Sequence, residues 1–273
     1  MRVKDLVEII ESSIVSKPCI DNKEERGKNG LVMGNPDDDV KGIVVAWKPT
    51  RDVLRRAAKL GYNVVIFHED LLYDFKPHPI VKEEVWRNPA KARVNADIGC
   101  IILRNGLNMV RYHTTWDDAD GGNNDVLVKD LGLRLLERLP CSRLAELSSP
   151  TSLEEFARRV ASVLKPPHVI VAGNLNLDRV ERVLVVAGGG AKHPAIVDEA
   201  AALGAQVLLS ADVTADTMFY AYELGIAIVD PGHHAMEEYG MKEFYRRLKE
   251  ELGRKGYNVP VEFIENKPVA RVI

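Results

Sequence analysis

The chain has 273 residues, of which 46% are hydrophobic and 28% charged, and its formal net charge is -3. This balance is typical of a globular protein with a hydrophobic core and excludes a disordered chain. Acidic and basic residues are interspersed, so no field of one sign indicates a nucleic acid or a membrane as partner. We also expect no membrane span, because no apolar run reaches the required length of about 18 residues.

The chain contains only three cysteines, Cys19, Cys100 and Cys141. Their number is odd and they lack the CxxC spacing of a thiolate zinc site, so the sequence predicts neither a disulfide framework nor such a site. A reducing environment suits this cysteine content. We therefore expect a location in the cytoplasm.

The first half of the chain alternates apolar, β-branched runs with segments of helical period, after an amphipathic helix at the N-terminus. Such alternation is typical of parallel strands joined by crossover helices and predicts an α/β fold. A helix is predicted from about Thr50 and is stopped by Gly61, and a second ends at Asn105. The predicted strands of this half are residues 42–47, 64–67 and 107–112.

The second half repeats this plan, with helices opened by Pro194 and Thr214. A polar, Pro-containing stretch at 148–152 precedes a helix near 153–164, and we interpret this region as the link between two lobes. The lobes are then residues 1–147 and 148–273. The predicted strands of the second lobe are residues 183–187, 207–209 and 226–229.

An internal repeat relates the two halves. Residues 57–66 align without a gap with residues 200–209, and residues 106–110 align with 225–229. After an offset of one residue, the segment beginning at His113 aligns with the segment beginning at His233, and each has a carboxylate four positions later. A chance match between small apolar helices is the alternative. The fold that we predict is two similar α/β lobes related by a pseudo-repeat, with a metal site in the cleft between them.

Three histidines each follow a predicted strand, at positions 68, 113 and 233. Ligands of open α/β sheets bind outside the carboxyl ends of the strands, so these imidazoles can converge. The spacing of four places Asp117 on the face of His113, and Glu237 on the face of His233. Imidazole combined with carboxylate suits zinc, manganese or iron. The sequence therefore predicts a metal site built from His68, His113, Asp117, His233 and Glu237.

Two further carboxylates, Glu69 and Asp212, fall opposite each other in the repeat. With them the donors exceed the need of one ion, and carboxylates can bridge two ions about 3.5–4 Å apart. We therefore expect two divalent metal ions, with Glu69 as a further ligand and Glu69 or Asp212 as a catalytic base. His234 is an alternative to His233, but it lies only three residues before Glu237. The remaining histidines are interpreted as structural: His78, His168 and His193.

Two glycine-rich segments could also contribute to a binding site, but their sequence signal is less specific. Residues 188–190 follow a strand and precede a helix, where backbone amides can bind phosphate, although a flexible turn explains them equally well. Residues 121–125 predict a tight turn that caps the next helix and directs its N-terminus at the site. An anionic substrate could bind there.

Three motifs in this sequence resemble those of one known family, the NGG-one-interacting-factor-three-like proteins, also known as GTP cyclohydrolase I type 2 homologues. Asp21-Asn22 with residues 29–34 resembles the family's DN…GL.xG signature. Residues 112–117 with 121–127 are similar to its HTxxD…GGxNDxL motif, and residues 232–237 to its GHxxxE motif. The resemblance covers nearly the whole chain.

The resemblance implies a two-lobed fold, a dinuclear metal centre on His68, His113, Asp117, His233 and Glu237, and a ring-like homohexamer. Two departures weaken a transfer of the family's chemistry as a whole. Where the family has His-His-Pro, this chain has an acid after the histidine, and the family's TGE segment is Ser210-Ala211-Asp212 here. We expect a metal-dependent hydrolase of a small anionic or nucleotide-like substrate. The alternative is a metal-binding scaffold or regulator without turnover.

Overall fold

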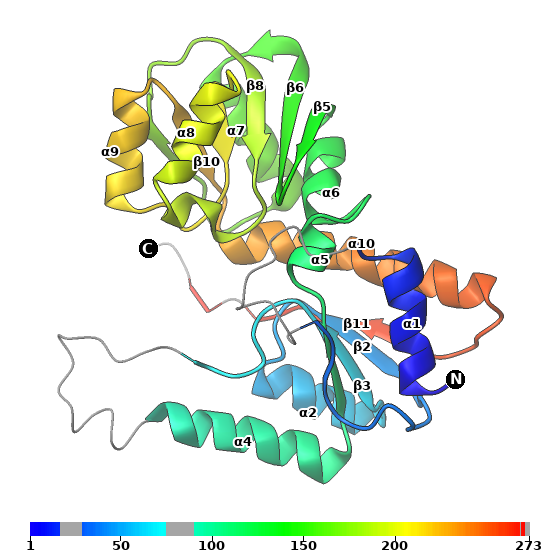
Figure 1. Cartoon of the computed structure of the whole chain (residues 1–273). Coiled ribbons are helices and arrows are strands. Elements are labelled where there is room, and N and C mark those ends of the chain that lie inside the picture. The colour runs from blue at the N-terminus through cyan, green and yellow to red at the C-terminus, as the bar shows by residue number, and fades with distance from the viewer. Residues whose placement is uncertain (17–28, 75–89, 268, 271–273) are drawn as a thin grey trace. The chain divides into compact units, whose positions relative to one another are not determined.

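A computed structural model describes the chain and divides it into two compact α/β units (Figure 1). The described residues are 1–16, 29–74, 90–267 and 269–270. Among these, the first unit contains residues 1–13, 29–74, 90–113 and 247–266, and the second contains residues 14–16, 114–246, 267 and 269–270. The boundary that the sequence suggested after residue 147 does not separate these units. Each unit is assembled from distant parts of the chain.

The first unit is built on a five-stranded sheet. Strand β1 is antiparallel to β4, whereas β4, β3, β2 and β11 are mutually parallel. The three predicted strands of this half are confirmed as β2, β3 and β4. The strand order is β1 (Gly30–Met33), β4 (Asn108–Arg111), β3 (Val64–Phe67), β2 (Ile43–Ala46) and β11 (Val261–Phe263).

Helices α1 (Val3–Ser13), α2 (Arg51–Leu60) and α4 (Ala90–Asn105) belong to this unit. Helix α2 begins where the sequence predicts, because the Thr50 side chain accepts a hydrogen bond from the Val53 amide. The helix ends at Gly61, whose φ of 73° is a left-handed value that favours glycine. Helices α2 and α4 pack on one face of the sheet through a shared apolar core.

The second unit is built on a six-stranded sheet. Strands β8, β9 and β10 are parallel and adjacent, whereas β5, β6 and β7 pair antiparallel. The strand order is β5 (Leu133–Leu139), β6 (Ser142–Thr151), β8 (Val180–Val185), β9 (Val207–Leu209), β10 (Ala227–Asp230) and β7 (Ile170–Gly173).

Helices cover both faces of this sheet (Figure 1). On one face Phe156 and Val160 of α7 pack with the buried valines of β8 and β9. On the other face Val197 of α8 and Ala221 of α9 pack with Leu184 of β8 and Leu208 of β9. The helices are α5 (Thr114–Asp117), α6 (Asn123–Asp130), α7 (Leu153–Leu164), the 3-10 helix η1 (Gly189–Lys192), α8 (Ala195–Ala202), α9 (Ala215–Glu223) and the first part of α10 (His233–Arg254), whose residues from 247 on belong to the first unit.

The two units share a local plan that agrees with the internal repeat. Residues 57–66 form the end of α2 and strand β3, and residues 200–209 form the end of α8 and strand β9. In each unit the next strand of the repeat, β4 or β10, lies parallel beside the preceding one. The predicted class of two α/β lobes is therefore confirmed.

One predicted element has a different role in the structure. Residues 148–151, interpreted as a link between lobes, are the end of β6, and Ser152 is the N-cap of α7. The preceding strand β5 was not predicted, because its leucines at positions 133, 135 and 136 do not alternate regularly. The segment forms a strand because it pairs antiparallel with β6. Here the tertiary pairing, and not the local sequence pattern, determines the secondary structure.

The expectation of a chain without disulfides is wrong at Cys141, which is disulfide-bonded, whereas Cys100 is free. Odd cysteine number and spacing cannot reveal a pairing that the fold brings about. Cys19 lies outside the described residues, as do Asp21, Asn22 and His78. Within the described ranges, no helix is long and apolar enough to cross a membrane.

Candidate metal centre

Six side chains that can each offer one ligand atom form two sets among the described residues. One set is His68, His113 and Asp117, and the other is Glu69, His233 and Glu237. These six residues are the ones that the sequence nominated as metal ligands.

In the first unit, the parallel strands β3 and β4 bring His68 and His113 together. Phe67 pairs with Arg111 at the carboxyl ends of these strands, and each histidine follows shortly after. The two imidazole ring centroids are 4.8 Å apart, with a 57° angle between the ring planes. His68 is fully buried. Two imidazoles at this separation can each direct a nitrogen at one ion, which is the usual arrangement of neighbouring histidine ligands.

The hydrogen bonding of His68 determines which ring nitrogen can bind a metal. Its Nδ1 lies 2.9 Å from the carbonyl oxygen of Tyr112. A carbonyl only accepts, so Nδ1 must carry the proton and donate it. The lone pair of the neutral ring is then on Nε2. Metal-binding histidines are commonly oriented in this way by a backbone oxygen on the opposite nitrogen.

Asp117 stands four residues after His113, at the end of the short helix α5. The carboxylate is buried and accepts a hydrogen bond of 2.5 Å from the side-chain amide of Asn123. The Asn124 amide donates to the backbone carbonyl of Asp117 and accepts from the Ala187 backbone amide. Both asparagines are fully buried, so they fix the position of this carboxylate.

The Asn-Asn pair belongs to the glycine-rich segment at 121–125, for which the sequence suggested a turn and a helix cap. Gly122 does cap α6, and Asp125 accepts from the Gly121 amide. The supporting role of Asn123 and Asn124 was not predicted. Adjacent amides after a tight turn were the available signal, but their partners are set by the tertiary fold.

In the second unit, His233 lies between two carboxylates. Its Nδ1 is 2.9 Å from Asp212 Oδ2, and its Nε2 is 2.9 Å from Glu237 Oε2. The hydrogen bond with His233 is the largest cause that lowers the pKa of Asp212 to about 2, and Lys192, 2.8 Å away, lowers it further. Asp212 is therefore an ionised acceptor, and Nδ1 of His233 donates to it.

This arrangement directs the second ring nitrogen of His233 at Glu237. When Nδ1 carries the proton and donates a hydrogen bond, a neutral ring presents the lone pair of Nε2 to a carboxylate oxygen. These two acceptors repel each other unless a proton or a metal ion lies between them. Nε2 and Oε2 are 2.9 Å apart, so both atoms can contact the same proton or metal ion.

Gly188 provides the space for this pair. Its φ is 72°, and a Cβ at this position would lie 2.0 Å from Glu237 Oε1 and 3.0 Å from His233 Nε2. The sequence left open whether residues 188–190 bind phosphate or form a flexible turn. Gly188 instead allows two candidate ligands to approach the backbone closely, and Ser210 holds the turn by donating to the Gly188 carbonyl.

The structure also shows the contacts of His234, the alternative histidine, and of Glu69, the additional carboxylate. His234 Nε2 lies 3.2 Å from the carboxylate of Glu238, the residue after Glu237. The partner of Glu237 is His233, which agrees with the preference for His233 over His234. Glu69 Oε2 lies 3.8 Å from Lys48 Nζ, and its side chain is largely buried. Lys192 was not predicted, because only the turn after Gly189 brings it to Asp212.

Known proteins resemble this chain over more than nine-tenths of its length. A curated protein of Clostridium perfringens, named GTP cyclohydrolase 1 type 2 homolog, is 25% identical over 98% of this chain and 97% of its own length. A protein of the same name from Methanocaldococcus jannaschii is 26% identical over 92% of this chain and 96% of its own length.

Solved structures agree on the fold. The crystal structure of a Bacillus cereus protein related to NIF3 superposes with a TM-score of 0.79 at 20% identity, covering 100% of this chain and 99% of that one. The sequence model of one family, described as Duf34/NIF3 (NGG1p interacting factor 3), matches residues 1–269. Together with the histidine and carboxylate motifs, this match shows that the chain belongs to the Duf34/NIF3 family.

Proposed function

We propose that this protein binds two divalent metal ions, zinc, manganese or iron, and uses them to hydrolyse a small anionic or nucleotide-like molecule. The ligands are His68, His113 and Asp117 for one ion, and Glu69, His233 and Glu237 for the other. The observation that carries the proposal is the paired orientation of two histidines. His68 and His233 each hold Nδ1 against an oxygen acceptor, which leaves Nε2 for a metal.

The donor set also supports the class of metal. Imidazole nitrogen with carboxylate oxygen is the ligation that zinc, manganese and iron accept, whereas magnesium prefers oxygen alone. When bound, such ions polarise an electrophile and lower the pKa of a coordinated water toward neutrality. The chain's own residues orient the ligands, through Asp212 and the Tyr112 carbonyl, and Glu69 is positioned as a candidate base.

The role of Asp212 is narrower than that of a general base. Its carboxylate accepts from both His233 and Lys192, and the pKa of about 2 makes it a poor proton acceptor. We propose that it positions His233, and that Glu69 is the better candidate base. The anionic substrate class is supported by the name shared by the relatives, GTP cyclohydrolase 1 type 2 homolog.

The experiment uses the full chain, stripped of metal by a chelator and reloaded separately with zinc, manganese or iron. Each form is assayed against nucleotides and phosphoesters, with Glu69→Gln as the test variant and Glu154→Gln, an exposed acid of α7, as the matched control. We expect turnover that requires the metal and falls at least about 100-fold in the Glu69 variant. Turnover equal in the stripped and reloaded forms would contradict a metal-dependent reaction.

Metal binding without turnover would instead favour the second candidate, an oligomeric scaffold or regulator. A catalytic centre keeps an open coordination position, whereas a structural centre fills its shell with protein donors. X-ray absorption of the reloaded protein separates the two, because an exchangeable water in the shell indicates the catalytic kind.

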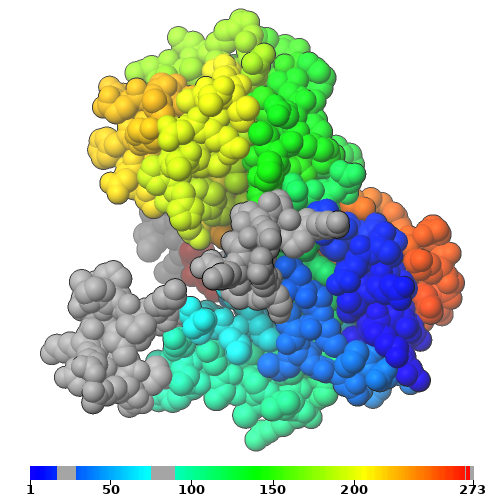
Figure 2. Space-filling model, viewed as in Figure 1, coloured from blue at the N-terminus to red at the C-terminus, as the bar shows by residue number. Residues whose placement is uncertain are grey.

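We also propose that the protein assembles with copies of itself, as a homohexamer. The support is a set of exposed apolar side chains on and beside α9, the helix whose residues are drawn in gold in Figure 2. Phe219 is 74% exposed, and Tyr222 and Leu175 are 60% and 63% exposed. Exposed apolar surface of this kind marks interaction sites. The location in the cytoplasm stays a prediction.

A further inference from the structure

Two adjacent asparagines at the start of α6, Asn123 and Asn124, contact segments that carry ligands of both sets. Asp117 belongs to the first ligand set, and His233 and Glu237 belong to the second. Both asparagines are fully buried. Burying a side-chain amide costs free energy unless its polar atoms are hydrogen-bonded. The partners of these amides therefore show which segments the pair holds together.

The side chain of Asn124 joins three segments of the second unit. Its Nδ2 donates to the backbone carbonyls of Asp117 at 3.0 Å and of Cys141 at 3.1 Å. Its Oδ1 accepts from the Ala187 backbone amide at 2.8 Å. Both N–H groups and the oxygen of this amide are thus used. Asn124 cannot shift without breaking a bond to the backbone of Asp117 or of Ala187.

The residue after Ala187 is Gly188, which lies against the second ligand set. A Cβ at Gly188 would be 2.0 Å from Glu237 Oε1 and 3.0 Å from His233 Nε2. Atoms packed this closely cannot move independently, because interiors have little free space. A displacement of Ala187 is therefore transmitted to both of these ligands.

Asn123 provides a second connection between the sets. Its Nδ2 donates to Asp117 Oδ1 at 2.5 Å. Its Oδ1 faces Gly240 of α10, where a Cβ would lie only 1.7 Å from this oxygen. Gly240 comes three positions after Glu237 on the helix that begins at His233, so Gly240 and Glu237 share a helix face. Asn123 thus links the carboxylate of Asp117 to the helix that carries two ligands of the other set.

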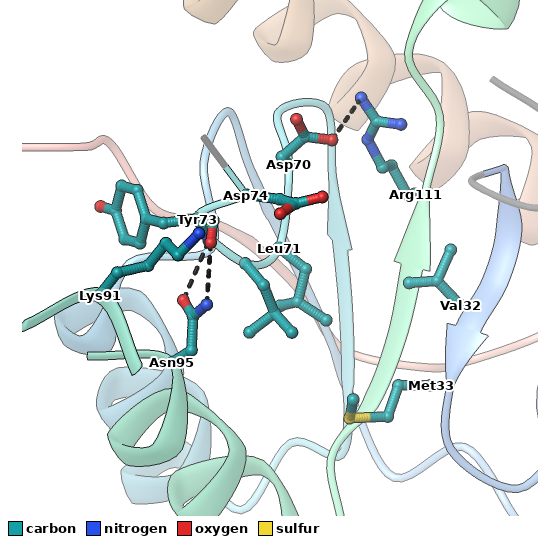
Figure 3. A pocket seen from close by; sticks show the side chains of 10 residues that line it. Val32, Met33, Asp70, Leu71, Tyr73, Asp74, Lys91, Asn95 and Arg111 are labelled. Atoms are coloured by element: carbon teal, nitrogen blue, oxygen red, sulfur yellow. Dashed lines mark hydrogen bonds and ion pairs between the residues drawn. The ribbon is translucent and has the colours of Figure 1, made fainter. Parts of the chain in front are cut away.

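A different support holds His68 in the first unit. Arg111 of β4 donates through Nε to the His68 carbonyl at 2.9 Å and lies 3.2 Å from Asp70. Both charged residues line a cavity of about 460 Å³ (Figure 3). These contacts join residues of one unit and position a ligand of one set. The asparagine pair differs, because its contacts reach carriers of both sets.

We propose that Asn123 and Asn124 are positioning residues that couple the two proposed ions. This inference rests on the proposed metal centre. An ion bound at Asp117 fixes both amides, and the amides hold the turn at 187–188 and helix α10 in the geometry that His233 and Glu237 need. Ordering that the first ion has completed is not repeated for the second. Each ion therefore strengthens the binding of the other.

The test measures zinc binding to the full chain by competition with a chromogenic chelator. Three proteins are compared: the wild type with both sets, His113→Ala with only the second set intact, and Glu237→Ala with only the first. The two-ion affinity of the wild type, divided by the product of the two single-site affinities, is the coupling factor. We expect a coupling factor of about 10.

Substitutions in the pair and beside it should lower this factor. Asn123→Ala, introduced into all three proteins, removes the link from Asp117 to α10 and should reduce the coupling factor at least about fivefold. Asn124→Ala should act in the same direction. Gly240→Ala should also do so, because its Cβ displaces the Asn123 amide. A residue with only a structural role would change the single-site affinities and leave the coupling factor as it is.

Gly253→Ala is the matched control, since a Cβ at this position of α10 meets nothing within 4 Å. It should leave the coupling factor unchanged. Thermal unfolding of the metal-free proteins confirms that each variant is folded. If Asn123→Ala does not fold, Gly240→Ala decides, because it changes only the space beside the amide.

Two results would overturn the proposal while the wild type still binds two zinc ions. They are a coupling factor of about 1 in the wild type, and a factor that Asn123→Ala or Gly240→Ala leaves unchanged. Both results leave the proposed metal centre intact. A wild-type protein that binds no zinc would contradict the metal centre itself, and this inference with it.

Discussion

His233 is held between Asp212 and Glu237, and this contact pair determines how the second unit presents a ligand. The sequence predicted His233 and Glu237, because a spacing of four on one helix is a local property. It also singled out Asp212, but not its role. Asp212 adopts a φ of 60°, a left-handed conformation uncommon for a residue other than glycine. That backbone turn, which no local pattern specifies, directs the carboxylate at the imidazole.

Removing the orienting carboxylate should weaken metal binding without unfolding the protein. We expect Asp212→Ala to lower metal affinity about 10–100-fold, because the loss of an oriented hydrogen bond frees the His233 ring. Competition with a chromogenic chelator measures the affinity. Asp216→Ala, an exposed acid of the same segment, serves as control. Equal affinities in the two variants would show that Asp212 does not position His233.

Gly188 gives a second prediction at the same scale. Gly188→Ala places a Cβ 2.0 Å from Glu237 Oε1 and requires a left-handed backbone at alanine. We expect a loss of about 1–3 kcal/mol in the free energy of unfolding, together with reduced metal content. Urea denaturation measures the stability. Gly253→Ala in α10, where a Cβ meets nothing within 4 Å, is the control and should not destabilise the protein. Normal stability and metal content in the Gly188 variant would contradict the close approach.

At the scale of elements, the sequence was informative where a local signal marks an end. Thr50 and Gly61 delimit α2, and Ser152 with Glu155 forms a capping box at the start of α7. The sequence was uninformative for strands β5 and β6. These strands depend on pairing with each other and on Arg143, a fully buried residue of β6 that contacts Asp118 and Asp125. Ion pairs between distant segments leave no periodic trace in the sequence.

The contacts of Asp125 predict a pH dependence of stability. Burial alone would raise the pKa of Asp125, but hydrogen bonds from Gly121, Arg138 and Arg143 outweigh it and lower the pKa. A carboxyl with a lower pKa in the folded state stabilises the fold at pH values above its unfolded pKa of about 3.9. This contribution is lost as the pH falls through the folded value.

Asp125→Asn should therefore cost about 1–3 kcal/mol of unfolding free energy at neutral pH. The difference from the wild-type protein should shrink as the pH falls below about 4. Urea denaturation at pH values on both sides of this range measures it. Glu137→Gln, an exposed acid of β5, is the control for a general charge effect. A difference that stays constant with pH would contradict the contribution of the ionised carboxylate.

At the scale of the molecule, the repeat and the alternation of elements predicted two α/β units and three parallel strands in each. Which segments of the chain form each unit could not be predicted. The first unit recruits residues 247–266 from the end of the chain, including β11, which adds to the sheet beside β2. Such recruitment depends on long-range packing, whereas the link predicted at 148–152 rested on local polarity and proline alone.

The exposed apolar residues of α9 give a prediction for assembly. Phe219→Glu should shift the protein from a larger oligomer to a smaller one, because a buried carboxylate without a partner is costly at an interface. Light scattering coupled to size-exclusion chromatography measures the mass. Glu223→Gln on the same helix is the matched control. An unchanged oligomer in the Phe219 variant would exclude this face as an interface between copies.

Metal content tests the central claim most directly. The protein is purified without chelator, and the metal bound per chain is measured for the wild type, for His113→Ala and Glu237→Ala, and for His168→Ala, an exposed histidine outside both ligand sets. The account predicts about two ions per wild-type chain, a loss in each of the two ligand variants, and no loss in the control. Unchanged metal content in both ligand variants would contradict the proposed centre.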